Sequence, residues 1–245
     1  MISELTSLER VAAVIPAYQA APTVGAVVRG VLHVLQGGVS EALVDDDGST
    51  DGTAEAAREA GARVISLPVN RGKGAALATA FADLFGRGAT GVVTLDADGQ
   101  HLPEEIPKLL AAAAPDADLV LGVRDHLFTK MSRVRRASNR LSSRAISLAA
   151  GQPLADVQTG FRFYSRRLID RVGFPEARFE AESAVVVRAA RAGFKVLTVP
   201  VKLGFADGRT TSHYRPLLDS LRIASAVTRA RFQLRPSRPS GPPRP

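Results

Sequence analysis

Short apolar runs alternate with alanine-rich stretches through the first half of the chain. The apolar runs end in loop residues and predict strands, at 11–18, 41–47, 62–69, 91–98 and 117–124. The stretches between them predict helices, at 22–36, 53–61 and 75–85, with a further helix beginning at Pro103. Alternation of this kind predicts an α/β domain with a mainly parallel, doubly wound sheet flanked by helices.

The second half of the chain is less regular. It predicts a basic helix near 131–150, a helix over 179–193, a strand over 195–203 and a basic amphipathic helix over 215–232, whereas 154–167 shows no clear period. We therefore expect a single α/β domain over 1–214, a basic C-terminal helix over 215–233, and a disordered tail rich in proline and arginine over 234–245.

The positive charge of the chain is unevenly spread. The 245 residues carry a formal net charge of +8, concentrated around 124–144 and after Asp219, beyond which there is arginine but no acid. Such blocks fit nucleic acid, an anionic membrane surface or a phosphorylated substrate, or a basic face that is simply solvated. Aromatic residues make up only 5% of the chain, which offers few stacking platforms and argues against a nucleic-acid binder.

The sequence lacks cysteine and long apolar segments, and these two features limit the class of protein. The chain has no cysteine, which excludes disulfides and thiolate metal sites. The N-terminal segment carries Glu4 and Glu9 and lacks the apolar core of a secretory signal, and no apolar run approaches the roughly 18 residues of a spanning helix. We expect a cytoplasmic protein without a spanning helix.

The segment LDADGQH, residues 95–101, predicts a metal site. Asp96, Asp98 and Gln100 stand at alternate positions after a strand, so their oxygens point the same way on an extended backbone and suit Mg²⁺ or Mn²⁺. A calcium hand is excluded, because His101 and Pro107 stand where that loop needs glycine and glutamate. The alternative is that the two aspartates only cap the following helix.

The segment NRGKGAA, residues 70–76, resembles a phosphate loop only in part. A Walker loop needs an earlier glycine, where this chain has Leu67, and a serine or threonine after Lys73, which is absent. Glycines around one lysine can still bring a cation to a diphosphate, and a plain turn is an equal alternative.

The segment VDDDGSTDGT places three adjacent carboxylates, Asp45, Asp46 and Asp47, at the end of a predicted strand. Adjacent carboxylates repel one another, which points to a ligand rather than a purely structural role. In open parallel sheets ligands bind beyond the carboxyl ends of the strands. The acidic loops 45–51 and 96–98 therefore form one candidate site, together with Tyr18 and Arg124.

Taken in order, VIPAY, VDDDGSTDGT, NRGKGAAL, LDADGQH, GVR, DVQTGFRFYSR, FEAE and SHYRP are similar to the inverting glycosyltransferases of family 2. Within that family the motifs resemble the dolichyl- or polyprenyl-phosphate mannose synthase branch, over about residues 11–224. The resemblance implies a GT-A fold, a nucleotide-sugar donor and a divalent metal, Mg²⁺ or Mn²⁺.

The resemblance also implies roles for individual residues on the donor side. Pro16, Tyr18, Asp46, Asp47, Lys73 and Asp96 match nucleotide-sugar-binding positions, and Asp96, Asp98 and Gln100 match the metal ligands, with Asp98 counted as catalytic. Two positions depart from the family pattern. Gln19-Ala20 replaces the usual Asn-Glu, and Asp45 replaces an apolar residue of the strand.

On the acceptor side the implied roles depend on the acceptor. A lipid phosphate is already anionic and needs cations rather than a base, which implies Arg124 and Arg133, with Ser138 or Ser142 as further donors. Arg162, Ser212 and His213 also match acceptor-binding positions. A hydroxyl acceptor would need a general base, for which Asp156 and Glu182 are the candidates.

We therefore expect transfer of a hexose, mannose or glucose, from a GDP- or UDP-sugar to polyprenyl phosphate by an enzyme attached peripherally to the cytosolic face of a membrane. One alternative is a soluble family 2 transferase acting on a hydroxyl acceptor. Another, of a different class, is a basic protein that binds nucleic acid or an anionic surface. The sequence leaves open the sugar, the base and association with a separate membrane subunit.

Overall fold

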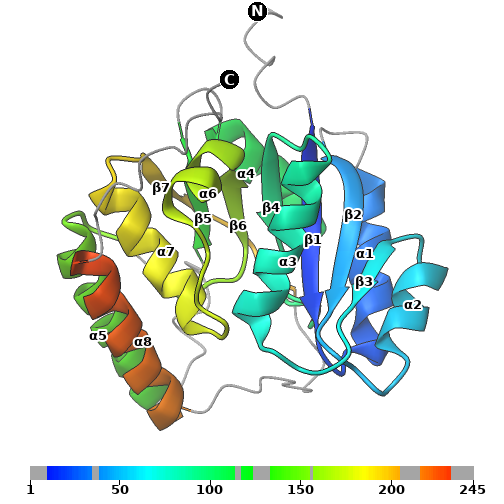
Figure 1. Cartoon of the computed structure of the whole chain (residues 1–245), viewed down its shortest axis with the longest axis horizontal. Coiled ribbons are helices and arrows are strands. Elements are labelled where there is room, and N and C mark those ends of the chain that lie inside the picture. The colour runs from blue at the N-terminus through cyan, green and yellow to red at the C-terminus, as the bar shows by residue number, and fades with distance from the viewer. Residues whose placement is uncertain are drawn as a thin grey trace, which may run out of the picture.

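The computed structural model describes residues 10–34, 39–113, 117–123, 133–154, 157–204 and 216–232, with backbone alone for 133–141 and 216–221. Its centre is a seven-stranded sheet of order β3-β2-β1-β4-β6-β5-β7 (Figure 1). The strands are β1 (Val11–Ala17), β2 (Val39–Asp46), β3 (Arg63–Ser66), β4 (Gly91–Thr94), β5 (Leu119–Val123), β6 (Arg162–Ser165) and β7 (Val196–Pro200). All neighbours pair in parallel except β6, which is antiparallel to β4 and β5.

Helices cover both faces of the sheet (Figure 1). One face carries α1 (Ala21–Val34), α2 (Thr53–Glu59) and α4 (Ile106–Ala113), which follows a short 3₁₀ turn, η2 (Pro103–Glu105). The other face carries α3 (Lys73–Gly86), α6 (Arg166–Val172) and α7 (Glu180–Arg191). Beyond α7 lie α5 (Arg133–Ala150) and α8 (Pro216–Phe232). The predicted doubly wound α/β fold is confirmed.

The buried core is divided by the sheet into two clusters. Along β1, Ala12 and Val14 face the cluster under α3 and α7, whereas Ala13 and Ile15 face the cluster under α1 and α4. All seven residues of β1 are buried. A strand covered on both faces has no polar side, which is why its sequence is an unbroken apolar run.

The segment 154–167 contains β6 and the first residues of α6, two elements that the hydrophobic pattern did not predict. β6 has only four residues and begins with a charged residue, Arg162, so it shows neither alternation nor an apolar run. α6 follows it without a loop, and the hydroxyl of Ser165 caps it by accepting a hydrogen bond from the Leu168 N–H at 3.1 Å. Because both elements are short and no loop separates them, the sequence shows no hydrophobic periodicity that would predict either one.

Helix α8 packs against α7 and α5 through an apolar face. Its side chains Ile223, Ala226, Val227 and Ala230 are buried in the cluster that also contains α3 and α7. Arg222, Arg229 and Arg231 are exposed, so in its described half the helix is basic and amphipathic as predicted. In the part of the chain that the structure describes, no helix is long and apolar enough to cross a bilayer. The predicted boundaries at 214 and 233 remain predictions.

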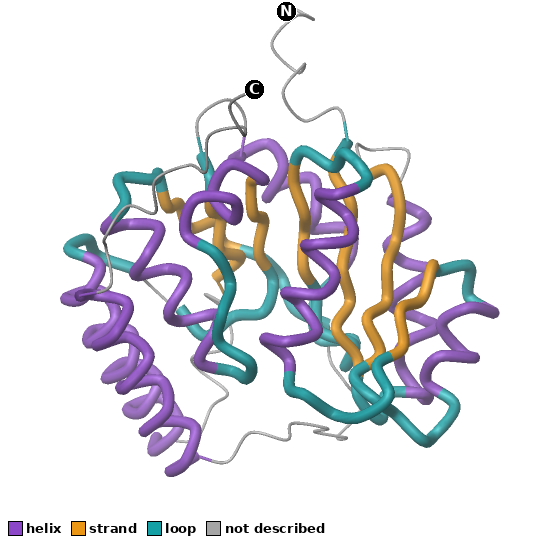
Figure 2. The backbone as a smooth tube through the Cα atoms, in the orientation of Figure 1, coloured by secondary structure: helices purple, strands orange, loops and turns teal. Residues whose placement is uncertain are grey.

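The loops that follow β1, β2 and β4 gather at one edge of the sheet. These three strands run parallel, so their carboxyl ends meet at the lower edge in Figure 2. The sequence places its acidic segments directly after these strands. The candidate site is therefore built where an open parallel sheet offers a crevice.

Candidate functional site

One side of the candidate site is formed by the loop after β1 and the loop after β2, which are hydrogen-bonded to each other. Gln19 adopts a left-handed backbone conformation with φ of 52°, which is uncommon for a residue other than glycine. Its N–H donates to the Ser49 hydroxyl at 2.9 Å, and its side-chain oxygen accepts from the Thr50 N–H at 3.1 Å. Gln19 thus holds the two loops together. Pro16 lies beside Asp45 in the strand register, and Tyr18 follows half-buried.

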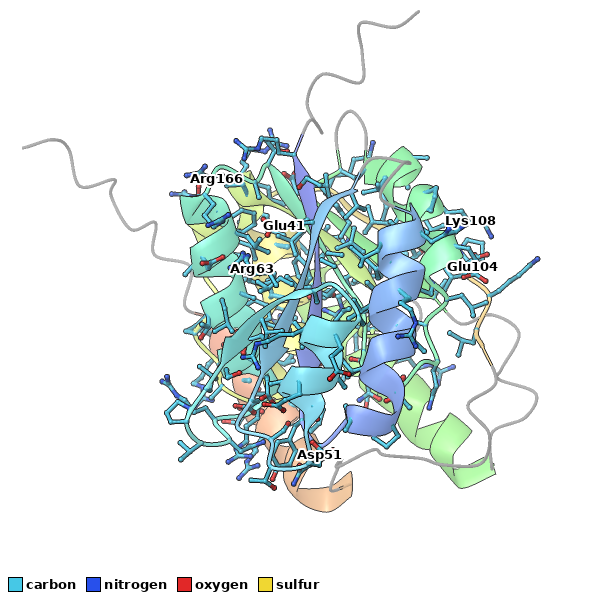
Figure 3. The ribbon with its side chains drawn as sticks, turned by 90° about the vertical axis from the view of Figure 1, so that its right-hand side faces the viewer. Glu41, Asp51, Arg63, Glu104, Lys108 and Arg166 are labelled. Carbon is cyan, nitrogen blue, oxygen red and sulfur yellow. The ribbon has the colours of Figure 1, made fainter. Side chains whose placement is uncertain are left out.

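Asp51 links the loop after β2 to the first residues of helices α1 and α2. Its carboxylate accepts hydrogen bonds from the Ala21 N–H at 3.1 Å and from the Thr53 N–H at 3.1 Å. Burial acts to raise the pKa of Asp51, but these bonds and one from the Thr53 hydroxyl outweigh it and lower that pKa. Figure 3 shows Asp51 at the lower edge of the molecule, where these loops meet.

Asp46 and Asp47 are buried and turned toward backbone N–H groups. Asp46 accepts from the Ser49 N–H at 3.0 Å, within its own loop. Asp47 accepts from the N–H groups of Arg71 and Gly72, both at 2.7 Å. Burial raises the pKa of Asp47 despite these two bonds. The second aspartate therefore holds the glycine loop 70–74 in place, and the donor contacts of Asp46 and Asp47 remain predictions.

Asp45 is a buried acid whose burial no hydrogen bond among the described residues accounts for. The side chain is 0% exposed, and neither of its oxygens has a hydrogen-bond partner among the described residues. Burial, followed by the charges of Asp47, Asp46 and Asp83, raises its pKa to about 8. Asp45 is therefore largely protonated at neutral pH, which answers how three adjacent carboxyl groups coexist in one strand end.

The centre of the site is an ion triad around Lys73, the first residue of α3. Its ammonium lies 2.6 Å from Asp96 Oδ1 and 2.9 Å from Glu182 Oε2. Burial acts to lower the pKa of Lys73, but the charges of Asp96 and Glu182 outweigh it and raise that pKa. The triad joins the glycine loop, the end of β4 and the start of α7, three segments far apart in the sequence.

Gly160 closes over this triad. A Cβ atom added there would lie 2.5 Å from both carboxylate oxygens of Asp96 and 2.7 Å from the ammonium of Lys73. Any side chain would therefore displace the triad. At Gly72 a φ of 100° and a Cβ position 2.6 Å from the Ala177 carbonyl oxygen likewise require glycine.

The loop Asp96–His101 is held by its own side chains. The Asp96 N–H donates to His101 Nδ1 at 3.1 Å, and the Gln100 N–H donates to Asp98 Oδ1 at 2.9 Å. The His101 ring is 4% exposed and stacks on Phe161 with centroids 5.4 Å apart. His101, unlike the aspartates, was not assigned a role from the sequence, although it lies inside the motif.

The predicted metal ligands fit a hard divalent cation in their chemistry. Asp96, Asp98 and Gln100 offer carboxylate and amide oxygens, the ligands of Mg²⁺ and Mn²⁺. Gly160 has no side chain to crowd the Asp96 carboxylate, since a Cβ atom there would lie 2.5 Å from both of its oxygens. Among the described residues no three His, Cys, Asp or Glu side chains cluster in a way that could hold a metal.

Arg162 occupies a different environment from the one predicted. Its guanidinium is 0% exposed and donates to the carbonyl oxygens of Thr159 at 2.7 Å, Val157 at 2.7 Å and Glu182 at 2.5 Å. Direct acceptor binding, the role predicted for Arg162, does not fit a side chain enclosed in this way. Arg162 instead ties the loop before β6 to the start of α7.

Several predicted acceptor-side residues lie outside the described residues. They are Arg124, Asp156, Ser212 and His213, and the side chains of Arg133 and Ser138. Their roles remain predictions. The structure brings together the donor-side residues and Glu182.

The hollow between α3 and α6 is not this site. Its lining residues include Phe81, Phe85, Phe174, Arg166 and Asp170. Arg166 lies at the opposite end of the molecule from Asp51 in Figure 3. The chemistry-bearing loops therefore lie away from this hollow.

The family model for glycosyl transferase family 2 matches residues 12–173. The chain belongs to this family. The match spans the glycine loop, the Asp-x-Asp loop and β6. The predicted GT-A fold agrees with solved structures of similar shape.

Curated relatives of this family 2 chain include two glycosyltransferases, and the printed name of one of them states a lipid phosphate. It is 33% identical over 187 residues to glycosyltransferase AglJ of Haloferax volcanii, covering 76% of this chain and 60% of AglJ. It is 33% identical over 171 residues to an undecaprenyl-phosphate 4-deoxy-4-formamido-L-arabinose transferase of Salmonella paratyphi B, covering 66% of this chain and 51% of that enzyme. The chain thus spans only 60% and 51% of these two relatives.

A solved structure shows the same fold. Glucosyl-3-phosphoglycerate synthase of Mycobacterium tuberculosis, in complex with Mn²⁺, UDP and phosphoglyceric acid, superposes with a TM-score of 0.72 at 23% identity. The match covers 97% of this chain and 84% of that one. At this identity the likeness establishes the fold alone.

Proposed function

We propose that this family 2 glycosyltransferase moves a hexose, with inversion, from a UDP- or GDP-sugar to polyprenyl phosphate, using Mg²⁺ or Mn²⁺. The observation that carries the choice of acceptor is the position of Glu182. This acid is the described candidate for a general base, yet its side chain is 8% exposed and paired with Lys73 at 2.9 Å. It is poorly placed to take a proton from a hydroxyl, which favours an acceptor that arrives ionised.

A lipid phosphate is such an acceptor. Its oxygen is anionic at neutral pH and attacks the sugar carbon without losing a proton. The relative from Salmonella paratyphi B, named as an undecaprenyl-phosphate transferase, supports the same choice at 33% identity. Arg124 and Arg133 are proposed to hold the acceptor phosphate, with Ser138, Ser212 and His213 as further contacts, because a phosphate needs charge-assisted donors to orient it.

On the donor side the leaving group is a nucleoside diphosphate, which gains negative charge as the sugar bond breaks. Asp96, Asp98 and Gln100 would hold the divalent cation, which when bound neutralises that charge. Lys73 supplies a further positive charge at the start of α3. Asp46 and the loop after β1 are proposed to bind the nucleoside, and Asp47 keeps the glycine loop in its position.

Attachment to an anionic membrane surface is part of the proposal. In the described half of α8, Arg222, Arg229 and Arg231 are exposed. The exposed large apolar side chains of the described chain include Leu148 on α5 and Phe232 on α8. Each Lys or Arg near an anionic surface adds about 1 kcal/mol of attraction. The enzyme would then meet its lipid acceptor on the cytosolic face.

The test is an acceptor assay with purified protein. UDP- and GDP-linked glucose and mannose are each offered with Mn²⁺ and either polyprenyl phosphate or phosphoglyceric acid. The proposal predicts transfer to polyprenyl phosphate and loss of transfer when Mn²⁺ is chelated. Transfer to phosphoglyceric acid but not to the lipid would establish the hydroxyl-acceptor alternative.

A further inference from the structure

Lys73 already forms ion pairs within the protein, unlike a lysine whose only partner would be a bound phosphate. Its side chain is 14% exposed and its ammonium touches two carboxylates, at 2.6 Å from Asp96 and 2.9 Å from Glu182. A lysine on an open glycine loop would instead remain solvated. The ammonium is therefore already neutralised inside the protein before any diphosphate arrives.

The backbone around Lys73 is fixed, so only its side chain can leave this position. The Ala75 N–H donates to the Ala177 carbonyl at 2.9 Å. A Cβ atom at Gly74 would lie 2.3 Å from the Glu176 carbonyl oxygen, which shows how closely α3 packs on this segment. Gly160 closes the third side of the ammonium. Movement of the ammonium toward a ligand means rotation of the lysine side chain away from Asp96.

Asp96 is at the same time the proposed metal ligand and the partner of Lys73. A divalent cation bound by Asp96 would stand close to the ammonium, and like charges at short range in a partly buried site repel. Lys73, Arg162, Asp96 and Glu182 balance in charge, and Asp98, the other proposed carboxylate ligand, leaves the cluster with one net negative charge without a metal. Added alone, a divalent cation gives this cluster an excess of positive charge.

We propose that Lys73 couples metal binding to donor binding. In the donor-free protein its ammonium occupies Asp96 and Glu182 and weakens metal binding. A nucleoside diphosphate attracts the ammonium to its own oxygens, which frees Asp96 for the cation, so metal and nucleotide enter together. This inference rests on the proposed metal-dependent use of a nucleotide sugar and adds an order to it. By linkage, the metal must strengthen nucleotide binding by the factor by which the nucleotide strengthens metal binding.

The coupling predicts effects of opposite sign for one substitution. Lys73→Met removes the charge and keeps most of the apolar stem. Mn²⁺ binding to the nucleotide-free protein should become about tenfold tighter, and binding of UDP or GDP in saturating Mn²⁺ should become about tenfold weaker. A lysine that only contacts the diphosphate would produce the second effect without the first.

The experiment measures free Mn²⁺ by electron paramagnetic resonance in titrations with and without UDP or GDP. Lys108→Met is the matched control, because Lys108 lies on α4 and pairs with Glu105 of η2 rather than with the triad. Since removal of Lys73 takes its ammonium away from two carboxylates, the double variant K73M/E182Q is compared with E182Q in the same titration. There too the nucleotide-free Mn²⁺ affinity should rise about tenfold.

The outcomes separate this inference from the function on which it rests. Unchanged or weaker nucleotide-free Mn²⁺ binding in both Lys73 variants, with normal Mn²⁺ binding in the presence of UDP or GDP, overturns the coupling role and leaves the metal assignment standing. Failure of the wild-type protein to bind Mn²⁺ even with UDP or GDP overturns the metal assignment itself.

Discussion

At the scale of single residues, Asp45 has the largest expected effect on stability. Its folded-state pKa of about 8 lies above the ordinary value of 3.8, so the folded chain keeps a proton that the unfolded chain releases. Stability from this group is complete below about pH 4 and is lost as pH rises toward about 8. Neither oxygen has a partner in the described chain, so little is lost on removing them.

Asp45→Val should therefore stabilise the protein, and increasingly so at higher pH. The gain is bounded by roughly 5 kcal/mol near pH 8, at about 1.4 kcal/mol per pKa unit. Urea unfolding of both proteins between about pH 5 and about pH 8 measures the difference. Parallel pH profiles for Asp45→Val and wild type would show that Asp45 ionises freely.

Asp98→Ala should abolish transfer and leave the fold intact. The side chain is half-buried and accepts one hydrogen bond, from the Gln100 N–H within its own loop. Loss of a metal ligand should lower kcat at least about a hundredfold, or roughly 2.7 kcal/mol. Transfer rate and thermal midpoint are compared with Asp170→Ala, a change on exposed α6. Near wild-type turnover of Asp98→Ala in added Mn²⁺ would rule out its role as a ligand.

The sequence predicted the acidic residues of the site but not their partners. Asp96, Asp98 and Gln100 follow a strand that the apolar pattern predicts, so their position after the end of that strand could be predicted from the sequence. The pairing of Lys73 with Glu182 depends on how α7 packs against α3, and no local pattern encodes that. The enclosure of Arg162 by three carbonyl groups was not predicted either, because a charged residue is expected at the surface.

At the scale of elements, Arg162 joins β6, the loop before it and α7. Arg162→Met leaves three buried carbonyl groups without their donor and should destabilise the protein by about 3–5 kcal/mol. Arg166→Met, which removes an exposed partner of Asp170, should change stability by less than about 0.5 kcal/mol. Chemical denaturation measures both. A stable Arg162→Met protein with only a raised acceptor KM would restore the acceptor role.

The elements that were predicted correctly include strands that are buried on both faces. β1 and β4 are buried throughout, so an apolar run revealed them. β6 and α6 were missed because each is short and β6 is antiparallel within a parallel sheet. The place of β6 in the sheet depends on its pairing with β4 and β5. The sequence of β6 alone does not specify that pairing.

At the scale of the whole molecule, the basic charge of +8 is proposed to hold the protein at an anionic surface. Removing residues 234–245 should weaken binding to anionic vesicles and barely change the melting temperature, because a segment rich in proline and arginine buries little surface. Vesicle flotation at low and high salt measures the attraction, with zwitterionic vesicles as the control. Unchanged binding to anionic vesicles would remove the tail from the account.

The central claim is the lipid-phosphate acceptor, and steady-state kinetics of three variants test it most directly. With donor and polyprenyl phosphate varied separately, Arg124→Ala and Arg133→Ala should each reduce acceptor use about ten- to a hundredfold, or roughly 1.5–3 kcal/mol, with little change in the donor KM. Asp156→Asn should be milder, since no proton has to be removed. Loss of activity in Asp156→Asn, with both arginine variants still active, would contradict the claim and identify a hydroxyl acceptor served by a general base.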